Sequence, residues 1–143
     1  MCGFVTIVAR DGVEVDPRVL RTMGDRLAHR GPDGRGVAMF GGEQLTEYRE
    51  GAFQVGLGHR RLSILDLSEA GAQPMRRDDL VIAYNGEIYN YLELRDELRQ
   101  LGHAFHSDCD TEVLLAAYQQ WGKDCLAKCN GMWAFALLDR GRR

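Results

Sequence analysis

The 143-residue sequence has no apolar run near the roughly 20 residues that a membrane-spanning helix needs. It also lacks a basic segment followed by an apolar stretch at its start, so no secretory signal is visible. Its net charge of -3 and its pI near 5.8 argue against a surface built to bind nucleic-acid phosphates. These absences exclude a membrane protein and a nucleic-acid scaffold, and we expect a cytoplasmic location.

Lysine and proline are scarce, whereas glycine is abundant. Among 18 cationic residues only Lys123 and Lys128 are lysines, a bias that by itself says little about function. The chain has 3 prolines and 17 glycines, so we expect many turns. Hydrophobic residues make up 45% and charged residues 27%, which is ordinary for one globular domain spanning residues 1–143.

The four cysteines do not form the paired Cys-x2-Cys pattern of a zinc knuckle. His103, His106 and Cys109, followed by Cys125 and Cys129, do have the ligand types that suit zinc. We nevertheless predict no metal site, and we expect Cys125 and Cys129 to pack as small apolar groups. A small zinc-binding module is kept as an alternative, and a disulfide framework is not expected.

Hydrophobic patterning predicts a mixture of short strands and helices. Apolar or alternating stretches predict strands at residues 3–9, 36–40, 45–49, 53–59, 80–84 and 132–138. A hairpin tip is expected at Gly41-Gly42, and the polar segment 68–77 is expected to be a loop.

Helical spacing of apolar residues predicts three helices, which begin near residues 17, 90 and 111. Asp16 precedes Pro17 and is expected to cap the first helix. Asn90 is expected to cap the second helix, and Asp108 or Asp110 the third.

The end of the sequence predicts a missing partner strand. The apolar segment 132–138 leads into a turn at Asp139-Arg140-Gly141, after which only Arg142 and Arg143 follow. We therefore expect the chain to be a piece of a longer protein, truncated at its C-terminal side. A natural terminus after an edge strand is the alternative.

Cys2 is the most informative residue for chemistry. The initiator methionine is normally removed before a small side chain, which would leave Cys2 with a free α-amine. An α-amine has a pKa of about 7.7–8.0 and a thiol one of about 8.5, so the amine can take the thiol's proton. A terminal cysteine thus forms its own nucleophile–base pair. Taken alone, a cysteine at position 2 is a weak signal.

A thiolate that attacks a carbonyl needs hydrogen-bond donors for the oxyanion. Asn85 and Gly86 follow the predicted strand 80–84 and can offer a side-chain amide and a backbone N–H. A hairpin turn is the alternative reading of Asn-Gly, although the following residues lead into a helix.

An amino-acid substrate needs a cation for its carboxylate and an acid for its ammonium group. Arg60 and Arg61 follow a predicted strand, and arginine binds carboxylates in a bidentate manner. We assign no proton transfer to His29 or His59.

A series of motifs carries a family resemblance. In chain order they are Met1-Cys2-Gly3, His29-Arg30-Gly31-Pro32-Asp33, His59-Arg60-Arg61-Leu62-Ser63-Ile64, Gly71-Ala72-Gln73-Pro74-Met75, Asn85-Gly86-Glu87-Ile88-Tyr89-Asn90 and Asp110-Thr111-Glu112-Val113. Together they resemble the glutaminase domain of glutamine-hydrolysing asparagine synthetases, which are class II glutamine amidotransferases. The resemblance covers essentially the whole chain. It implies an α+β fold of the N-terminal-nucleophile hydrolase type, with two antiparallel β-sheets between helical layers.

The resemblance also implies catalytic roles. Cys2, freed of Met1, would attack the side-chain amide of glutamine and form a glutamyl thioester. Its α-amine would pass the proton to the departing ammonia, while Asn85 and Gly86 form the oxyanion hole.

Substrate-binding roles follow from the same resemblance. Arg61 would bind the substrate carboxylate, and Glu87 and Asp110 would hold its α-amine. The choice of Asp110 over Asp108 depends on the register with the following Thr-Glu-Val.

The resemblance implies no cofactor for this domain. Ammonia would pass to a synthetase domain that uses ATP and magnesium, but the chain has no Ser-Gly-Gly-x-Asp-Ser pyrophosphate loop. An amidotransferase with another acceptor and a catalytically silent regulatory module are the alternatives. A homodimer is one assembly that we consider.

Overall fold

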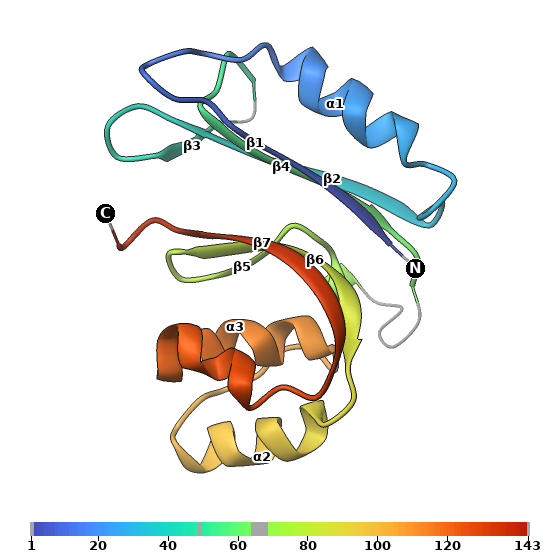
Figure 1. The fold of residues 1–143 in the computed structure, drawn as a ribbon, viewed down its shortest axis with the longest axis vertical. Coiled ribbons are helices and arrows are strands. Elements are labelled where there is room, and N and C mark those ends of the chain that lie inside the picture. The colour runs from blue at the N-terminus through green and yellow to red at the C-terminus, as the bar shows by residue number, and fades with distance from the viewer. Residues whose placement is uncertain (1, 49, 64–68, 143) are drawn as a thin grey trace.

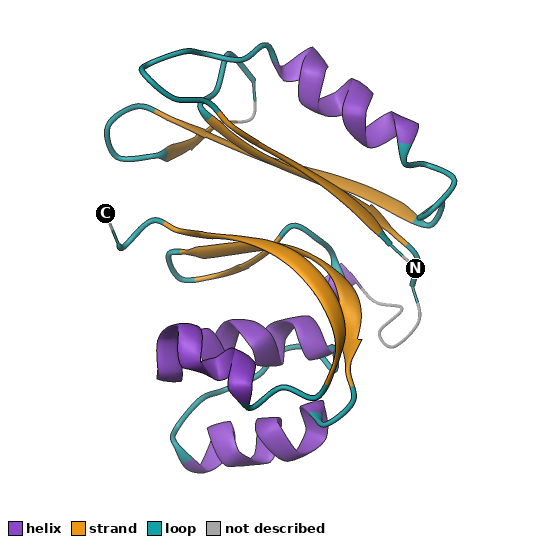
Figure 2. Cartoon of the chain, viewed as in Figure 1, coloured by secondary structure: helices purple, strands orange, loops and turns teal. Residues whose placement is uncertain are grey.

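A computed structural model of the chain describes residues 2–48, 50–63 and 69–142. Two antiparallel sheets lie face to face, with helix α1 (Pro17–Arg26) on the outer side of one sheet. Helices α2 (Tyr91–Gln100) and α3 (Asp110–Trp121) cover the outer side of the other (Figures 1 and 2). The expected α+β sandwich is confirmed.

The first sheet has the order β1-β4-β2-β3 and is antiparallel throughout. Its strands are β1 (Gly3–Val8), β2 (Gly34–Gly41), β3 (Thr46–Tyr48) and β4 (Val55–Arg61). As expected, Asp16 caps α1, because its carboxylate accepts the N–H of Arg18 at 2.8 Å. The predicted strand 53–59 starts late, since Phe53 forms only an isolated bridge with Val15. Arg49, at the end of the predicted strand 45–49, lies outside the described residues.

The second sheet has the order β5-β6-β7. Its strands are β5 (Met75–Arg77), β6 (Leu80–Ile88) and β7 (Gly131–Asp139). Short 3₁₀ helices lie at Glu69–Gly71 and Gly122–Ala127. The expectation of a loop over 68–77 is wrong in part, because polar Arg76 and Arg77 belong to β5, which pairs with β6. The sequence before Glu69, at 64–68, lies outside the described residues.

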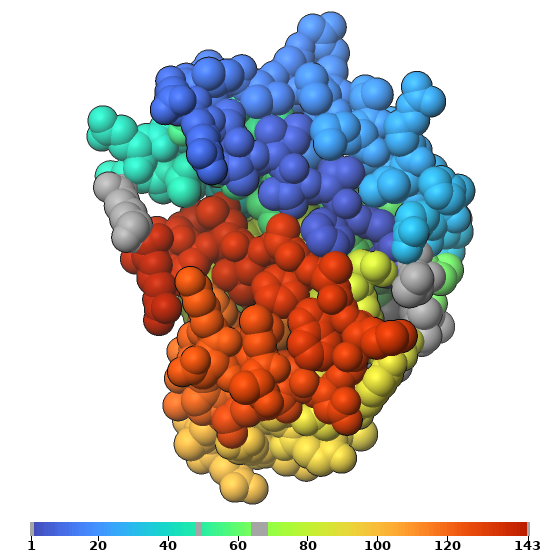
Figure 3. All heavy atoms as spheres, viewed as in Figure 1, coloured from blue at the N-terminus to red at the C-terminus, as the bar shows by residue number. Residues whose placement is uncertain are grey.

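Strand β6 is buried on both faces, which explains its unbroken apolar sequence. Leu80, Ile82 and Tyr84 pack toward the helices, whereas Val81 and Ala83 pack between the two sheets. In the space-filling view, β7 (red) lies directly against the N-terminal sheet (Figure 3). The two faces of β6, the central strand of its sheet, therefore contribute to two different hydrophobic clusters.

The structure corrects two strand ends. Strand β6 continues past Tyr84 to Ile88, so Asn85 and Gly86 lie within the strand and neither follow it nor form a hairpin turn. Hydrogen bonds to β7 extend β6 beyond the point where its apolar pattern stops. Likewise, Arg60 and Arg61 do not follow a strand but are the last residues of β4.

Two helix caps differ from expectation. Asn90 stands at the N-cap of α2, but its side chain accepts the N–H of Asn130 at 2.8 Å and donates to the carbonyl of Lys128 at 2.9 Å. The N-cap position of α3 belongs to Cys109, so a cap by Asp108 or Asp110 is wrong. Tertiary contacts outcompete the local capping bond at Asn90. None of the helices in residues 2–48, 50–63 and 69–142 is long and apolar enough to cross a bilayer.

Candidate active site

A pocket of about 540 Å³ opens where the ends of β1 and β4 meet β6, β7 and the start of α3. Two thiols (Cys2 and Cys109), two side-chain amides, two acids and a guanidinium lie on walls that are mainly apolar. Its lining includes every predicted site residue: Cys2, Arg61, Asn85, Gly86, Glu87 and Asp110.

The Cys2 thiol is held by backbone groups at the end of β4. Its Sγ accepts the N–H of Leu62 at 3.3 Å and donates to the carbonyl of the same residue at 3.5 Å. Arg30 donates from Nε to the carbonyl of Cys2 at 3.1 Å. Gly31, which follows, passes so close to the backbone of Arg60 that a Cβ there would collide with it. The motif around Arg30 thus anchors the start of β1, a role that sequence reasoning did not assign.

Asn85 and Gly86 face the pocket from β6, opposite Ala134 and Trp133 of β7. A Cβ on Gly86 would collide with the carbonyl of Met132, so only glycine allows the two backbones this approach. An amide side chain and a backbone N–H from a paired strand are rigid donors, as stabilisation of an oxyanion requires.

Asp110, at the first turn of α3, is buried and presents its carboxylate to the pocket. Its Oδ2 accepts the hydroxyl of Tyr84 at 2.8 Å and the N–H of Ile88 at 3.0 Å. Burial raises the pKa of Asp110, although these hydrogen bonds oppose the increase. Asp108, the alternative acid, instead lies on the surface and bonds to Arg95 at 3.0 Å.

The two neighbouring arginines diverge. Arg61 lines the pocket. Arg60 points to α1, where its Nε donates to the carbonyl of Gly24 at 3.1 Å and its guanidinium pairs with Asp25. Of the two candidates for a substrate carboxylate, only Arg61 therefore lines the pocket, as does the exposed Glu87.

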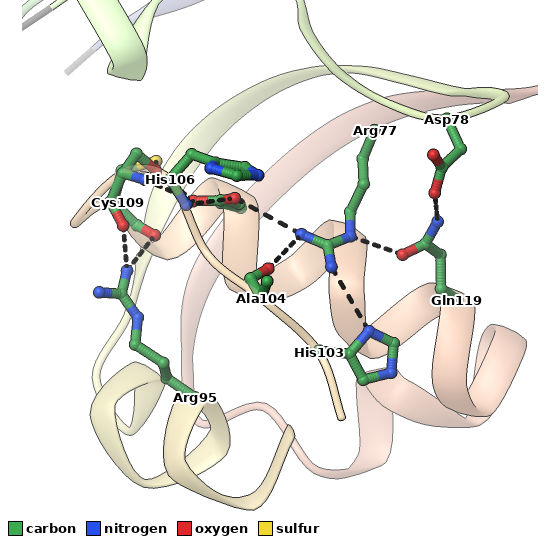
Figure 4. A network of polar contacts seen from close by, with 10 residues as sticks. Arg77, Asp78, Arg95, His103, Ala104, His106, Cys109 and Gln119 are labelled. Atoms are coloured by element: carbon green, nitrogen blue, oxygen red, sulfur yellow. Dashed lines mark hydrogen bonds and ion pairs between the residues drawn. The ribbon is translucent and has the colours of Figure 1, made fainter. Parts of the chain in front are cut away.

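A polar network behind the pocket holds the segment that leads into α3 (Figure 4). The carboxylate of Glu112 accepts the N–H and the hydroxyl of Ser107 at 2.8 and 2.7 Å, and the N–H of His106 at 3.0 Å. Burial raises the pKa of Glu112, but these bonds outweigh it and leave the pKa below its usual value. Arg95 donates to the carbonyls of Ser107 and Cys109 at 2.9 and 3.2 Å. The side chains of Arg95 and Glu112 are both buried, and sequence reasoning assigned neither of them a role. Glu112 belongs to one of the family motifs, whereas nothing local distinguishes Arg95 from a surface charge.

The residues of the zinc alternative have other partners. His103 contacts Arg77 at 3.4 Å and Gln120 at 2.9 Å, and Cys129 donates to the carbonyl of Cys125 at 3.3 Å. Within the described part of the chain, no cluster of His, Cys, Asp and Glu side chains could hold a metal ion. All four cysteines are free thiols.

His59 of β4 joins the two sheets by a bond to Tyr84 of β6, a residue that lines the pocket. It is 2% exposed, and its Nε2 donates to the carbonyl of Tyr84 at 2.9 Å. Burial lowers the pKa of His59 to about 4, helped by the charge of Arg61 and opposed by the bond to Tyr84. The imidazole is therefore neutral in the folded protein at neutral pH.

This neutral histidine predicts a pH-dependent stability. Between its folded pKa and an unfolded value of about 6.5, His59 binds a proton only in the unfolded chain, so stability falls as pH falls. When the pH is lowered from about 7.5 to 5, the free energy of unfolding of the wild-type protein should fall by about 2 kcal/mol more than that of His59→Asn. Urea unfolding of both proteins at each pH measures the difference. Equal losses would show that His59 does not stay neutral.

Comparisons with known proteins agree with this arrangement. The glutamine amidotransferase domain family matches residues 1–143. The chain is 39% identical over 145 residues to glutamine-hydrolysing asparagine synthetase 1 of Bacillus subtilis, covering 98% of this chain and 21% of that protein. It is also 39% identical to asparagine synthetase 3 of the same organism, and this match covers 99% of this chain and 22% of that protein. The chain thus spans only about a fifth to just over a quarter (21% to 28%) of the length of curated relatives that it matches.

The fold has solved counterparts. Glutamine phosphoribosylpyrophosphate amidotransferase of Bacillus subtilis, complexed with ADP and GMP, matches with a TM-score of 0.78 at 23% identity. The match covers 98% of this chain and 35% of that one, and it shows a shared fold. Since the family match extends over residues 1–143, the chain belongs to the glutamine amidotransferase domain family.

Proposed function

We propose that this domain hydrolyses the side-chain amide of glutamine to glutamate and ammonia, with Cys2 as the nucleophile. The observation that carries the proposal is the composition of the pocket. The Cys2 thiol, one pair of oxyanion donors and charged groups of both signs line the same cavity, although they come from distant parts of the chain.

In the proposed reaction, removal of Met1 exposes the α-amine of Cys2, which takes the thiol proton. The thiolate attacks the amide carbon, and Asn85 and Gly86 donate hydrogen bonds to the resulting oxyanion. The C–N bond breaks as the α-ammonium group returns the proton to the leaving nitrogen, which departs as ammonia. Water then attacks the thioester, releasing glutamate and restoring the thiol.

The charged residues would orient the amino-acid end of the substrate. Arg61 would pair with the α-carboxylate, because its planar guanidinium can bind both oxygens. Glu87 and Asp110 would receive the α-ammonium group. The domain would need no cofactor for this chemistry.

The fate of ammonia depends on a larger protein. Since the named relatives are asparagine synthetases several times longer than this chain, we infer that ammonia passes to an ATP- and magnesium-dependent synthetase domain. Aspartate is the acceptor that their names favour, and another acceptor is the alternative. Free thiols at all four cysteines are consistent with a reducing compartment such as the cytoplasm.

Glutamine hydrolysis assays of the wild type and of Arg61→Ala together test the proposal. The processed protein should release glutamate and ammonia in equal amounts from glutamine. Loss of a charged hydrogen bond, worth about 1.5–3 kcal/mol, should raise the KM of Arg61→Ala roughly 10- to 150-fold. Arg60→Ala is the matched control, because Arg60 bonds to α1 outside the pocket and its loss should leave KM unchanged. No glutamate from the wild type would favour a silent module, and a normal KM in Arg61→Ala would contradict the carboxylate site.

A further inference from the structure

Tyr84 is a buried tyrosine whose hydroxyl bonds to a carboxylate of the pocket. Tyr84 belongs to β6 and is 2% exposed, and its side chain packs in the cluster that includes residues of α3. Its hydroxyl donates to Oδ2 of Asp110 at 2.8 Å, and the N–H of Ile88 reaches the same oxygen at 3.0 Å. The next residue along β6 is Asn85. A single strand therefore holds a pocket acid with one side chain and presents an oxyanion donor with the next.

The backbone of Tyr84 is held as firmly as its side chain. Its N–H donates to Oε1 of Gln73 at 2.7 Å, and its carbonyl accepts Nε2 of His59 at 2.9 Å. The β5–β6 register pairs Met75 with Ile82, so residue 73 would stand opposite Tyr84. The side chain of Gln73 takes the place of that ladder bond and also donates to Thr111 at 3.3 Å. Groups from three parts of the chain thus fix the position of Tyr84.

We propose that Tyr84 is a positioning residue that holds Asp110 in place to receive the α-ammonium group of the substrate. The inference rests on the proposed function, in which glutamine occupies the pocket. Because Tyr84 also precedes Asn85, it sets the spacing between the ammonium site and the oxyanion hole.

The hydroxyl matters because Asp110 is buried. Burial favours the neutral acid, whereas the bonds from Ile88 and Tyr84 favour the carboxylate. Without the hydroxyl, the Asp110 carboxylate loses a hydrogen-bond donor, and water does not readily replace this donor because Asp110 is buried. A neutral or rotated carboxyl group would attract the ammonium group weakly.

Tyr84→Phe removes only this hydroxyl, and two ligands separate positioning from folding. Glutaramate keeps the carboxylate and the amide of glutamine but lacks the α-amine. In Tyr84→Phe, the KM for glutamine should rise about tenfold or more, while the inhibition constant of glutaramate changes less than about threefold. The value of kcat should change little. Tyr118→Phe is the matched control, because its hydroxyl bonds to Asp139 at 3.3 Å away from the pocket, and both constants should stay unchanged.

A double-mutant cycle tests whether Tyr84 acts through Asp110. Asp110→Asn should raise the KM for glutamine selectively, and adding Tyr84→Phe should raise it no further. Equal weakening of glutamine and glutaramate, or additive effects in the cycle, would overturn the inference and leave the proposed function standing. Absence of glutamine hydrolysis in the wild type would overturn both.

Discussion

Cys2→Ala is expected to abolish glutamine hydrolysis and to leave the protein folded. The substitution removes the sulfur that would attack the amide. The other thiol that lines the pocket, Cys109, contacts the hydroxyl of Ser107 at 3.0 Å, and burial raises its pKa, so it should not replace Cys2 and the rate should fall by at least ~10⁴-fold. The fold should persist because Arg30 binds the backbone carbonyl of residue 2, which alanine retains. Ammonia release measures the activity, and urea unfolding measures the stability.

Covalent labelling sharpens this test. A glutamine analogue with an alkylating group at the amide position should add one equivalent to wild-type protein, as seen by intact mass. Cys2→Ala should take up none. Cys129→Ala is the control, because burial raises the pKa of that thiol and it lies outside the pocket, so labelling should be normal. Normal ammonia release by Cys2→Ala would contradict the nucleophile assignment, and an unlabelled wild type whose mass includes Met1 would identify the missing processing step.

Asn85→Ala should lower kcat by roughly 10²–10³, the usual effect of losing one oxyanion donor. Some activity should remain because the N–H of Gly86 is a backbone donor that the substitution leaves in place. KM should change little, since the bond strengthens only as charge develops on the oxygen.

The matched control for this variant is Asn90→Ala, which removes an amide that bridges to Asn130 and Lys128 outside the pocket. It should lower stability and leave kcat unchanged. A loss in Asn85→Ala of less than about threefold would be too small for an oxyanion donor and would reject the role.

Much of the architecture could be predicted because it depends on local patterns. The strands at residues 3–9 and 132–138 were correctly placed by apolar runs, and the start of α1 by Asp16-Pro17. Errors occurred where tertiary hydrogen bonds overrode those patterns. Pairing with β7 carries β6 through polar residues, and pairing with β6 turns part of the expected loop 68–77 into β5.

The candidate site divides in the same way. Motif resemblance identified residues that line one pocket, and register with Thr111 selected Asp110 over Asp108. Sequence reasoning could not find the residues that support them, such as Arg95, Glu112 and Tyr84. Each lies in a helix or strand whose local pattern also suits an ordinary surface or core position.

The order of residues along the chain was therefore sufficient to reveal the family and the layered fold through the resemblance of short motifs, and to name the candidate site residues. How those groups are held depends on contacts across long separations. The Cys2 thiol meets Leu62 from 60 positions away, and the hydroxyl of Tyr84 meets Asp110 from 26 positions away. Such bonds form only when the two sheets and α3 pack together, since packing alone brings these polar groups within hydrogen-bond distance in a dry interior.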